Sequence, residues 1–367
     1  MTPEPTLPRY CDRSLSDLLA AVTGSSTNPG MQDIRKALSG ARSRVMVIAD
    51  GLGAHQLEEY ASLAPNLHAA QLEPATSVAP TTTAAALTSL TTGCTPGQHG
   101  VIGYKMRVGD ELLQTLRWSI AGVDATERVR PEAIQVCEPL LRQDGHAVAY
   151  VGKAQYEVGG FTRAHLRGAN YHGISDPTQL VDVVTRVVND APFVIAYHDA
   201  IDHVAHVDGL GSSYQAELVR LEMMVNDLRE RLADDVAIVV VADHGQIDVG
   251  STQVELPRAA YPLIAFMSGE GRFRWLHAVV GEQRALTAML KDALAQSCWV
   301  WTRREAIDLG LFGPDVSVDV EERLGDLCVV PFVNAFVLDP AEAKELRMRG
   351  RHGSLTPAEM LVPVIVR

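Results

Sequence analysis

A short window of the chain, residues 197–209, is crowded with side chains that bind metals. Within it, Asp202 and His206 are four residues apart, so on a helix they share one face. Carboxylate and imidazole together suit Zn²⁺. Asp199 and His203 have the same spacing, so spacing alone leaves the register of the pair open. A polar, solvated loop would also fit the pattern.

Two further acidic residues follow strongly apolar runs. Asp50 comes after VMVIA, and Asp243-His244 comes after VAIVVVA. Short β-branched runs of this kind are typical of buried parallel strands. Neighbouring residues on a strand point to opposite faces, so Asp243 and His244 serve one site only if the strand ends before them, as Gly245 permits. An ordinary boundary between strand and loop would show the same residues.

The segment PTTTAAALTSLTTG at 80–93 predicts a helix with a hydroxyl N-cap and a glycine C-cap. Capping needs only one of the three threonines. A hydroxyl at a helix N-terminus lies beside free backbone N–H groups, in a potential that favours phosphate or sulfate. A threonine hydroxyl is a weak nucleophile until a metal or base lowers its pKa. A metal held by Asp50, Asp243 and His244 would do so.

The elements that must position these residues alternate between strands and amphipathic helices. The apolar runs RVMVIA, FVIAYH and VAIVVVA alternate with helical patterns at about 82–92, 177–190 and 214–232. This order predicts an α/β fold with a central, mostly parallel sheet flanked by helices on both faces. Because such sheets place ligands beyond the carboxyl ends of their strands, the acidic strand ends are expected to converge on one edge.

The remaining segments predict a division into parts. Residues 1–43 contain one amphipathic stretch and are expected to form a peripheral segment. Residues 44–245 and 346–367 are expected to form the catalytic core. In 246–345 the runs WLHAVV and CVVPFV predict strands, and EQRALTAMLKDALAQ predicts a helix, so this range is expected to form a smaller inserted subdomain with returning strands.

Composition excludes several classes of function. The chain has 367 residues, of which 32 are basic and 45 acidic, and a net charge of −13 argues against a nucleic-acid polymer or an anionic membrane as partner. Residues MTPEPTLPRYCDRS lack the pattern of a signal peptide. The five cysteines are widely spaced without a CxxC, which argues against a disulfide framework and favours a cytoplasmic protein. DGLGAH lacks GxGxxG, which argues against a dehydrogenase.

Together these segments resemble the alkaline phosphatase superfamily, and within it the type I phosphodiesterase/nucleotide pyrophosphatase family. Each motif is weak alone, but their order along the chain is specific. The motifs are ADG at 49–51, PTTTAAALTSLTTG at 80–93 with PGQHG after it, DHVAHVDG at 202–209, ADHG at 242–245 and RHGS at 351–354.

The resemblance implies two divalent metal ions, for which His and Asp ligands favour Zn²⁺. It assigns the first metal to Asp50, Thr83, Asp243 and His244. It assigns the second metal to Asp202, His206 and His352. The family pattern puts the nucleophile on Thr83 rather than on Thr81 or Thr82, and Gly209 behind His206 favours the Asp202–His206 register.

The charges of this set balance. Two Zn²⁺ ions are matched by three carboxylates and a threonine alkoxide. Without ions, at least one of three converging carboxylates would take up a proton. The resemblance further implies a two-step in-line displacement through a covalent phospho-threonine.

The sequence departs from the nucleotide-cleaving members of the family near the nucleophile. Ala85 and Ala86 stand where those members have Pro-Asn, and Tyr104 stands where they place an Asn that donates to a phosphoryl oxygen. Tyr104, its neighbour Lys105, and Lys153 after HAVAYVG are therefore candidate substrate contacts. Packing of Tyr104 against the helix would explain its presence equally well.

The predicted function is metal-dependent hydrolysis of phosphodiester or phosphoanhydride bonds in a small phosphorylated substrate, with nucleotide-like substrates favoured. One alternative is a phosphomonoesterase on the same dimetal site. An alternative of another class is a metal-stabilised binding protein without turnover. The sequence carries no signal for the oligomeric state.

Overall fold

A six-stranded sheet forms the centre of the computed structural model, which describes residues 2–143 and 146–367. Its strand order is β10-β9-β11-β1-β12-β20. All neighbouring strands are parallel except β20, which runs antiparallel to β12. The predicted mostly parallel sheet is therefore confirmed. The strands are β1 (Ser43–Ala49), β9 (Ala149–Lys153), β10 (Asn170–Ile174), β11 (Phe193–His198), β12 (Val236–Val241) and β20 (Val364–Val366).

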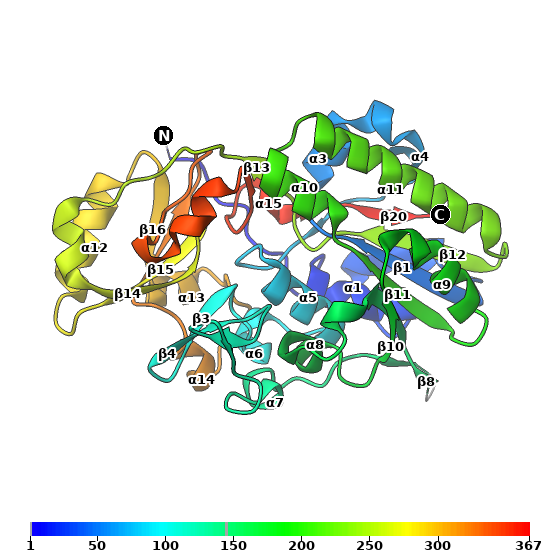
Figure 1. Cartoon of the computed structure of the whole chain (residues 1–367), viewed down its shortest axis with the longest axis horizontal. Helices are drawn as coiled ribbons and strands as arrows, with labels where there is room; N and C mark the ends of the chain where they lie inside the picture. Colours follow the sequence, from blue (N-terminus) through cyan, green and yellow to red (C-terminus); the bar gives the residue numbers. More distant parts are fainter. Residues whose placement is uncertain (1, 144–145) are drawn as a thin grey trace.

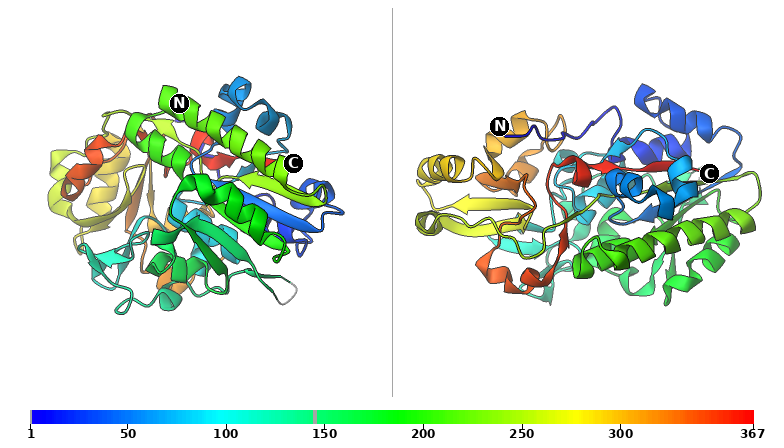
Figure 2. Two further views of the ribbon diagram at one scale, coloured as in Figure 1. Left: turned by 45° about the vertical axis from the view of Figure 1, so that its right-hand side comes forward. Right: turned by 90° about the horizontal axis from the view of Figure 1, so that it is seen from above.

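Helices cover both faces of this sheet. Helix α9 packs on β9 and β11 with α11 beside it, and α1 packs against α5. Seen from above, α11 and the N-terminal helices lie on opposite sides of the sheet (Figure 2, right). Among the described residues, no helix is long and apolar enough to cross a membrane. These helices are α1 (Leu15–Thr23), α5 (Thr83–Thr92), α9 (Leu180–Val187) and α11 (Ser212–Arg231), so the three predicted helical patterns are confirmed.

The predicted peripheral segment contributes to the main core. Leu15, Leu18 and Leu19 on one face of α1 are fully buried within the same hydrophobic cluster as the central strands. Arg13 just before the helix is also buried, and its guanidinium pairs with Asp33 at 2.7 Å. Because α1 packs against α5, the N-terminal residues support the threonine helix.

A second, smaller sheet lies inside the range predicted as an insert. Its four antiparallel strands, in the order β14-β15-β17-β16, enclose a separate hydrophobic cluster with α12. Figure 1 shows this sheet and α12 at the opposite end of the molecule from the main sheet. The domain boundaries themselves stay a prediction. The elements are β14 (Ile264–Glu270), β15 (Phe273–Ala278), α12 (Gln283–Ala293), β16 (Cys298–Thr302) and β17 (Leu327–Pro331).

Two short features were not predicted from the sequence. An antiparallel sheet of four short strands lies between residues 105 and 124, in the order β3-β4-β5-β6. Strand β13 pairs with β18, which joins the two ends of the insert. Both features consist of strands too short to show a periodic pattern. Their bounds are β3 (Lys105–Val108), β4 (Glu111–Gln114), β5 (Ser119–Ile120), β6 (Val123–Asp124), β13 (Ile247–Asp248) and β18 (Gly350–Arg351).

Candidate metal centre

The three acidic strand ends meet at one edge of the main sheet, as its topology predicts. Strand β1 lies between β11 and β12, so the residues that follow these strands are neighbours. Asp50 follows β1, Asp243 follows β12, and Asp202 lies in the first turn of α10 (Ala200–Asp208), the helix after β11. Gly51 has a φ of 77°, and a Cβ there would stand 3.1 Å from the Asp202 Cα. This close approach requires glycine.

The first group of ligand atoms belongs to Asp50, Asp243 and His244, and these atoms lie within 4.8 Å of one another. The Nε2 atom of His244 is 3.5 Å from Asp50 Oδ1 and 3.4 Å from Asp243 Oδ2. The hydroxyl of Thr83, at the start of α5, is 3.2 Å from the same nitrogen. All four residues are buried. We call this set the buried group.

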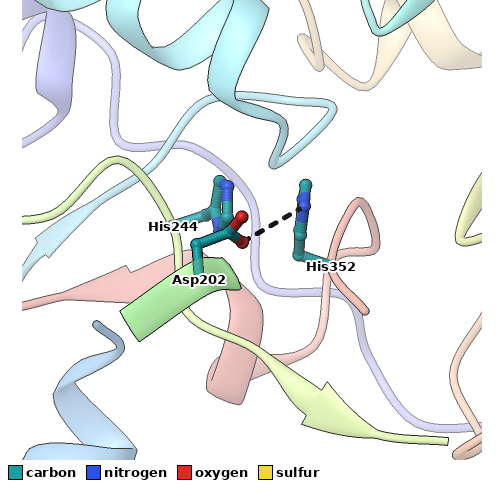
Figure 3. Close-up of side chains that lie close together, drawn as sticks. All are labelled: Asp202, His244 and His352. Carbon is teal, nitrogen blue, oxygen red and sulfur yellow. Dashed lines mark ion pairs between the residues drawn. The ribbon is translucent and has the colours of Figure 1, made fainter. Parts of the chain in front are cut away.

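The second set of ligand atoms lies beside the first. Ligand atoms of Asp202, His244 and His352 also fall within 4.8 Å of one another, and Figure 3 shows the Asp202 carboxylate beside the imidazoles of His244 and His352, whose rings stack with centroids 3.6 Å apart. His206 Nε2 is 3.3 Å from Asp202 Oδ1, and His352 Nε2 is 3.8 Å from the same oxygen. We call Asp202, His206 and His352 the outer group. His244 touches both groups, so the seven predicted residues form one continuous cluster.

Backbone carbonyls orient all three imidazoles. The Nδ1 atoms of His206 and His352 lie 2.7 Å from the carbonyl oxygens of Gly350 and Thr81, and His244 Nδ1 lies 3.1 Å from that of Gly245. A carbonyl oxygen only accepts, so each Nδ1 must donate its proton. Each Nε2 is then left with a lone pair directed into the cluster, which is the arrangement found for metal-ligating histidines.

The electrostatics of the cluster fit divalent cations. Asp50 Oδ1 and Asp243 Oδ2 are buried and have no hydrogen-bond partner within the described part of the chain. Burial raises the pKa of Asp50 well above its usual range, and the nearby Asp243 and Asp202 carboxylates raise it further. Burial lowers the pKa of His352 well below its usual value, as do His244 and His206. Buried, unpaired carboxylate oxygens are costly, and a bound cation would compensate them.

Supporting residues complete the centre, and sequence reasoning missed them. The Tyr197 hydroxyl donates a hydrogen bond to Asp50 Oδ2. The Gln246 amide donates to Asp202 Oδ1 at 2.6 Å, and the backbone N–H groups of Gly51 and His244 donate to Asp243 Oδ1 at 3.1 and 3.0 Å. A tyrosine in a strand looks like ordinary core. The only sequence signal was that Tyr197 and Gln246 stand close to the acidic strand ends.

The other polar residues of the threonine and histidine motifs have structural contacts. Thr81 donates to the Ser354 carbonyl at 2.9 Å and accepts from the Gly353 N–H at 2.8 Å. The buried His99 of PGQHG lies 2.9 Å from the Ser89 hydroxyl, and burial lowers its pKa to about 3. Thr81 therefore fixes the segment that carries His352, and His99 is a neutral contact for α5. Of Thr81 and Thr83, it is Thr83 that faces His244.

Comparisons with known proteins identify the family and the fold of the chain. The sequence profile of the family "Type I phosphodiesterase / nucleotide pyrophosphatase" matches residues 44–355. The chain belongs to this family. Family membership indicates a hydrolase of the phosphodiesterase/pyrophosphatase type. No curated protein sequence matches the chain significantly.

Two solved structures illustrate the shared fold of this type I phosphodiesterase family member. One is murine ectonucleotide pyrophosphatase/phosphodiesterase 5, as an inactive threonine-to-alanine variant in complex with AMP, with a TM-score of 0.65, 14% identity, and coverage of 89% of this chain and 88% of that chain. The other is phosphonoacetate hydrolase from Sinorhizobium meliloti 1021 in complex with phosphonoformate, with a TM-score of 0.60, 19% identity, and coverage of 89% and 90%. At these identities the likeness shows the fold alone.

A cavity of about 800 Å³ opens beside the metal centre of this phosphodiesterase family member, and Tyr104 lines it together with Asp50 and Thr83. The two lysines predicted as substrate contacts are placed differently. Lys105 pairs with the buried Glu342, and Lys153 pairs with Asp199 at 2.7 Å. Neither lysine lines the cavity, whereas Tyr104 does, and a contact of any of the three with substrate stays a prediction. Each lysine forms an ion pair with a carboxylate that is distant in sequence, and a single sequence does not show such a pair.

Proposed function

We propose that this chain hydrolyses phosphodiester or phosphoanhydride bonds, with Thr83 as the nucleophile at a centre for two divalent cations. The observation that carries the proposal is the position of the Thr83 hydroxyl. It is buried at the N-terminus of α5 and lies 3.2 Å from His244 Nε2. It adjoins carboxylate oxygens that have no hydrogen-bond partner among the described residues. A buried hydroxyl in this setting is placed to react rather than to cap a helix.

The donor set divides naturally between two ions. The buried group of Asp50, Thr83, Asp243 and His244 would hold the first, and the outer group of Asp202, His206 and His352 would hold the second. Carboxylate and imidazole ligands suit Zn²⁺ best. When bound, the ions would lower the pKa of the threonine hydroxyl and neutralise charge on the phosphoryl oxygens.

The residues of the chain account for the remaining steps. Thr83 Oγ1 forms a bond to phosphorus as the bond from phosphorus to the leaving oxygen breaks, and the hydroxyl proton passes to solvent. The free N–H groups in the first turn of α5 face the developing negative charge. Water then cleaves the phospho-threonine, which restores the hydroxyl and releases the phosphorylated product. The carbonyl contacts of the three imidazoles keep the site in one geometry throughout.

Nucleotide-like substrates are favoured on two grounds. The volume of the cavity, about 800 Å³, lies in the range that suits a ligand of that size. The murine neighbour is described in complex with AMP, and as an inactive variant in which a threonine is replaced by alanine. That description supports both a nucleotide-like substrate and a threonine nucleophile in this chain.

A phosphomonoesterase on the same site is the alternative, and Tyr104 is the observation that favours it. This tyrosine lines the cavity where nucleotide-cleaving members of the family have an asparagine. A tyrosine hydroxyl in place of an asparagine amide near the phosphoryl oxygens would change whether the phosphomonoester or the phosphodiester is stabilised more strongly. Hydrolysis of bis-p-nitrophenyl phosphate is compared with that of p-nitrophenyl phosphate on the zinc-loaded protein. A strong preference for the monoester would replace the diesterase proposal by this one.

The Thr83→Ala variant tests the nucleophile and also the alternative of a binding protein without turnover. We expect it to lose hydrolysis while zinc content, measured by elemental analysis, stays near that of the wild type. Thr82→Ala is the matched control, since the Thr82 side chain makes no capping hydrogen bond to the same helix. Acid-quenched wild type should carry a phosphoryl group by mass spectrometry, absent from Thr83→Ala. Full activity of Thr83→Ala would overturn the proposal.

A further inference from the structure

A rigid turn at the rim of the cavity presents one apolar and one cationic side chain. It spans residues 115–118, between β4 and β5. Its end residues, Thr115 and Trp118, are fully buried, whereas Leu116 is 39% exposed and Arg117 is exposed. Leu116 and Arg117 both line the cavity. The two ends of the turn are therefore anchored in the core, and its two middle residues line the cavity.

Hydrogen bonds fix both ends of this turn. The Thr115 N–H donates to the Tyr104 carbonyl at 2.8 Å, and its hydroxyl donates to the Gly103 carbonyl at 2.8 Å. The Trp118 indole donates to the Val129 carbonyl at 2.6 Å. Trp118 also has a φ of 48°, a conformation that is costly for a bulky residue and that clusters at functional sites. The position of Arg117 is thus determined by structure on both sides of it.

Arg117 differs from the other charged residues around the cavity. Asp199 is paired with Lys153 at 2.7 Å, and the guanidinium of Arg351 lies 3.8 Å from the centre of the Phe336 ring. Within the part of the chain that the structure describes, no hydrogen bond or ion pair engages the Arg117 side chain. In a chain with a net charge of −13, a guanidinium without an acidic partner at a cavity rim is available to a ligand.

The wall of the cavity supplies a third kind of surface. Leu87, Phe161 and Leu166 line it together with Leu116. Gly160 allows α8 (Gly160–His165), which carries Phe161, to approach the anchored turn, since a Cβ there would stand 2.3 Å from Trp118 Cγ. The cavity thus combines a metal centre for a phosphoryl group, an apolar wall, and a guanidinium at the rim.

We propose that Arg117 is a specificity-determining residue that selects phosphoryl compounds carrying a second anionic group beyond an apolar spacer. The inference rests on the proposed function in one respect, because it takes the metal centre as the place where the phosphoryl group binds. Guanidinium pairs well with either a carboxylate or a second phosphoryl group, and both satisfy the same chemistry.

Calorimetric affinity of the zinc-loaded protein for matched phosphonates tests this inference without turnover. The acids 3-phosphonopropionate and 4-phosphonobutyrate are compared with propylphosphonate and butylphosphonate, which have the same chain length but lack the carboxylate. A propylene bisphosphonate distinguishes a second phosphoryl group from a carboxylate. We expect at least one compound with two anionic groups to bind roughly 10-fold more tightly than the alkylphosphonate of the same chain length. One charge-assisted hydrogen bond would provide a difference of this size.

The Arg117→Ala variant should abolish this difference and leave the affinity for the alkyl phosphonates unchanged, while Arg117→Lys should keep part of it. Arg128→Ala is the matched control, because Arg128 pairs with Glu111 at 3.1 Å and does not line this cavity. Equal affinity for both series in the wild type, or equal weakening of both in Arg117→Ala, would overturn the inference.

Failure of the proposed function would look different. Selective binding through Arg117 without hydrolysis of either bis-p-nitrophenyl phosphate or p-nitrophenyl phosphate would refute catalysis and support the role of Arg117. Failure of the alkyl phosphonates to bind at all would refute the phosphoryl site, and with it both proposals.

Discussion

The two halves of the candidate metal centre, the buried group and the outer group, are built in different ways. The buried group stands on the ends of two adjacent strands and on the first turn of α5, and its residues are almost inaccessible to solvent. In the outer group, the side chains of Asp202 and His206 are 17% and 20% exposed and come from α10. The first half is positioned directly by the central sheet, whereas the second depends on the docking of separate segments.

The contacts of the outer group show this dependence. His206 Nδ1 donates to the Gly350 carbonyl, and the N–H of Arg349 donates to the carbonyl of His206 at 2.8 Å. The chain that returns from the insert must therefore pack on α10 before His206 and His352 can act together. The sheet therefore positions the buried group. The outer group is positioned by a contact between segments about 150 residues apart in sequence.

The largest effect is expected from a matched pair of substitutions, Asp50→Asn in the buried group and Asp202→Asn in the outer group. Water cannot replace a ligand in the buried group but can reach the outer group. Asp50→Asn should lower kcat/KM for bis-p-nitrophenyl phosphate by roughly 10⁴-fold and Asp202→Asn by roughly 10²-fold, since a metal's charge stabilisation amounts to several kcal/mol. Steady-state kinetics and zinc content of both variants check this. Equal losses of rate would show that burial does not distinguish the two halves.

When a chelator removes the metal, the two groups should release their ions at different rates. Ligands that solvent reaches exchange more readily, so the outer group should release its ion first, at a rate roughly tenfold or more above that of the buried group. Zinc release is followed with a chromogenic chelator, and activity is sampled in parallel. We expect two phases, with activity lost in the first. A single phase that releases both ions together would contradict separate halves.

Sequence reasoning predicted the two halves unequally well. The convergence of Asp50 and Asp243 followed from physical rules, because both residues end apolar runs and parallel strands bring such ends together. The choice of Thr83 among the three threonines needed the family resemblance. The register of Asp202 and His206 was ambiguous from spacing, and no local pattern around His352 marked it as a ligand. Family resemblance was needed for both. No local pattern encodes the docking of β18 on α10, which joins distant segments.

The residues around the centre were the least predictable. Lys105 and Lys153 looked available for substrate, but Glu342 and Asp199 neutralise them, and these pairs depend on tertiary contacts. Arg117 drew no attention in the sequence, since a lone arginine between short strands has no pattern. The burial of α1 was also missed, because an amphipathic helix near a terminus shows that it packs on something but not on what.

Loss of the hydrogen bonds that orient the two aspartates should have a smaller effect. Tyr197→Phe removes the donor to Asp50, and Gln246→Leu removes the donor to Asp202. Supporting contacts of this kind are typically worth roughly 10- to 100-fold in metal affinity or activity. We expect about tenfold lower kcat/KM for Tyr197→Phe. The loss for Gln246→Leu should be smaller, because the Asp202 carboxylate is 17% exposed and can be hydrated. A larger effect in Gln246→Leu than in Tyr197→Phe would reverse the comparison.

The smallest expected effect concerns the stability of the metal-free protein. The pKa of Asp50 is raised by burial and by its carboxylate neighbours, so at neutral pH its ionised form opposes folding when no cation compensates it. In Asp50→Asn this charge is absent. The variant, though inactive, should therefore be more stable than the wild type by roughly 1 kcal/mol, or a few degrees in the unfolding midpoint of the chelated protein.

The difference in stability between Asp50→Asn and the wild type should depend on pH. Because the folded-state pKa of Asp50 lies above the unfolded value, the wild type regains stability as pH falls through the folded pKa towards the ordinary aspartate range. The depressed pKa of His352 acts in the opposite direction, but it is present in both proteins and largely cancels in their difference. The gap in midpoint between Asp50→Asn and wild type should be widest at neutral pH and should close on acidification. Asp202→Asn, at a carboxylate that is 17% exposed rather than 3% as in Asp50, should show a narrower gap at neutral pH, and a gap as wide as that of Asp50→Asn would mean that solvent does not relieve the charge of the outer group.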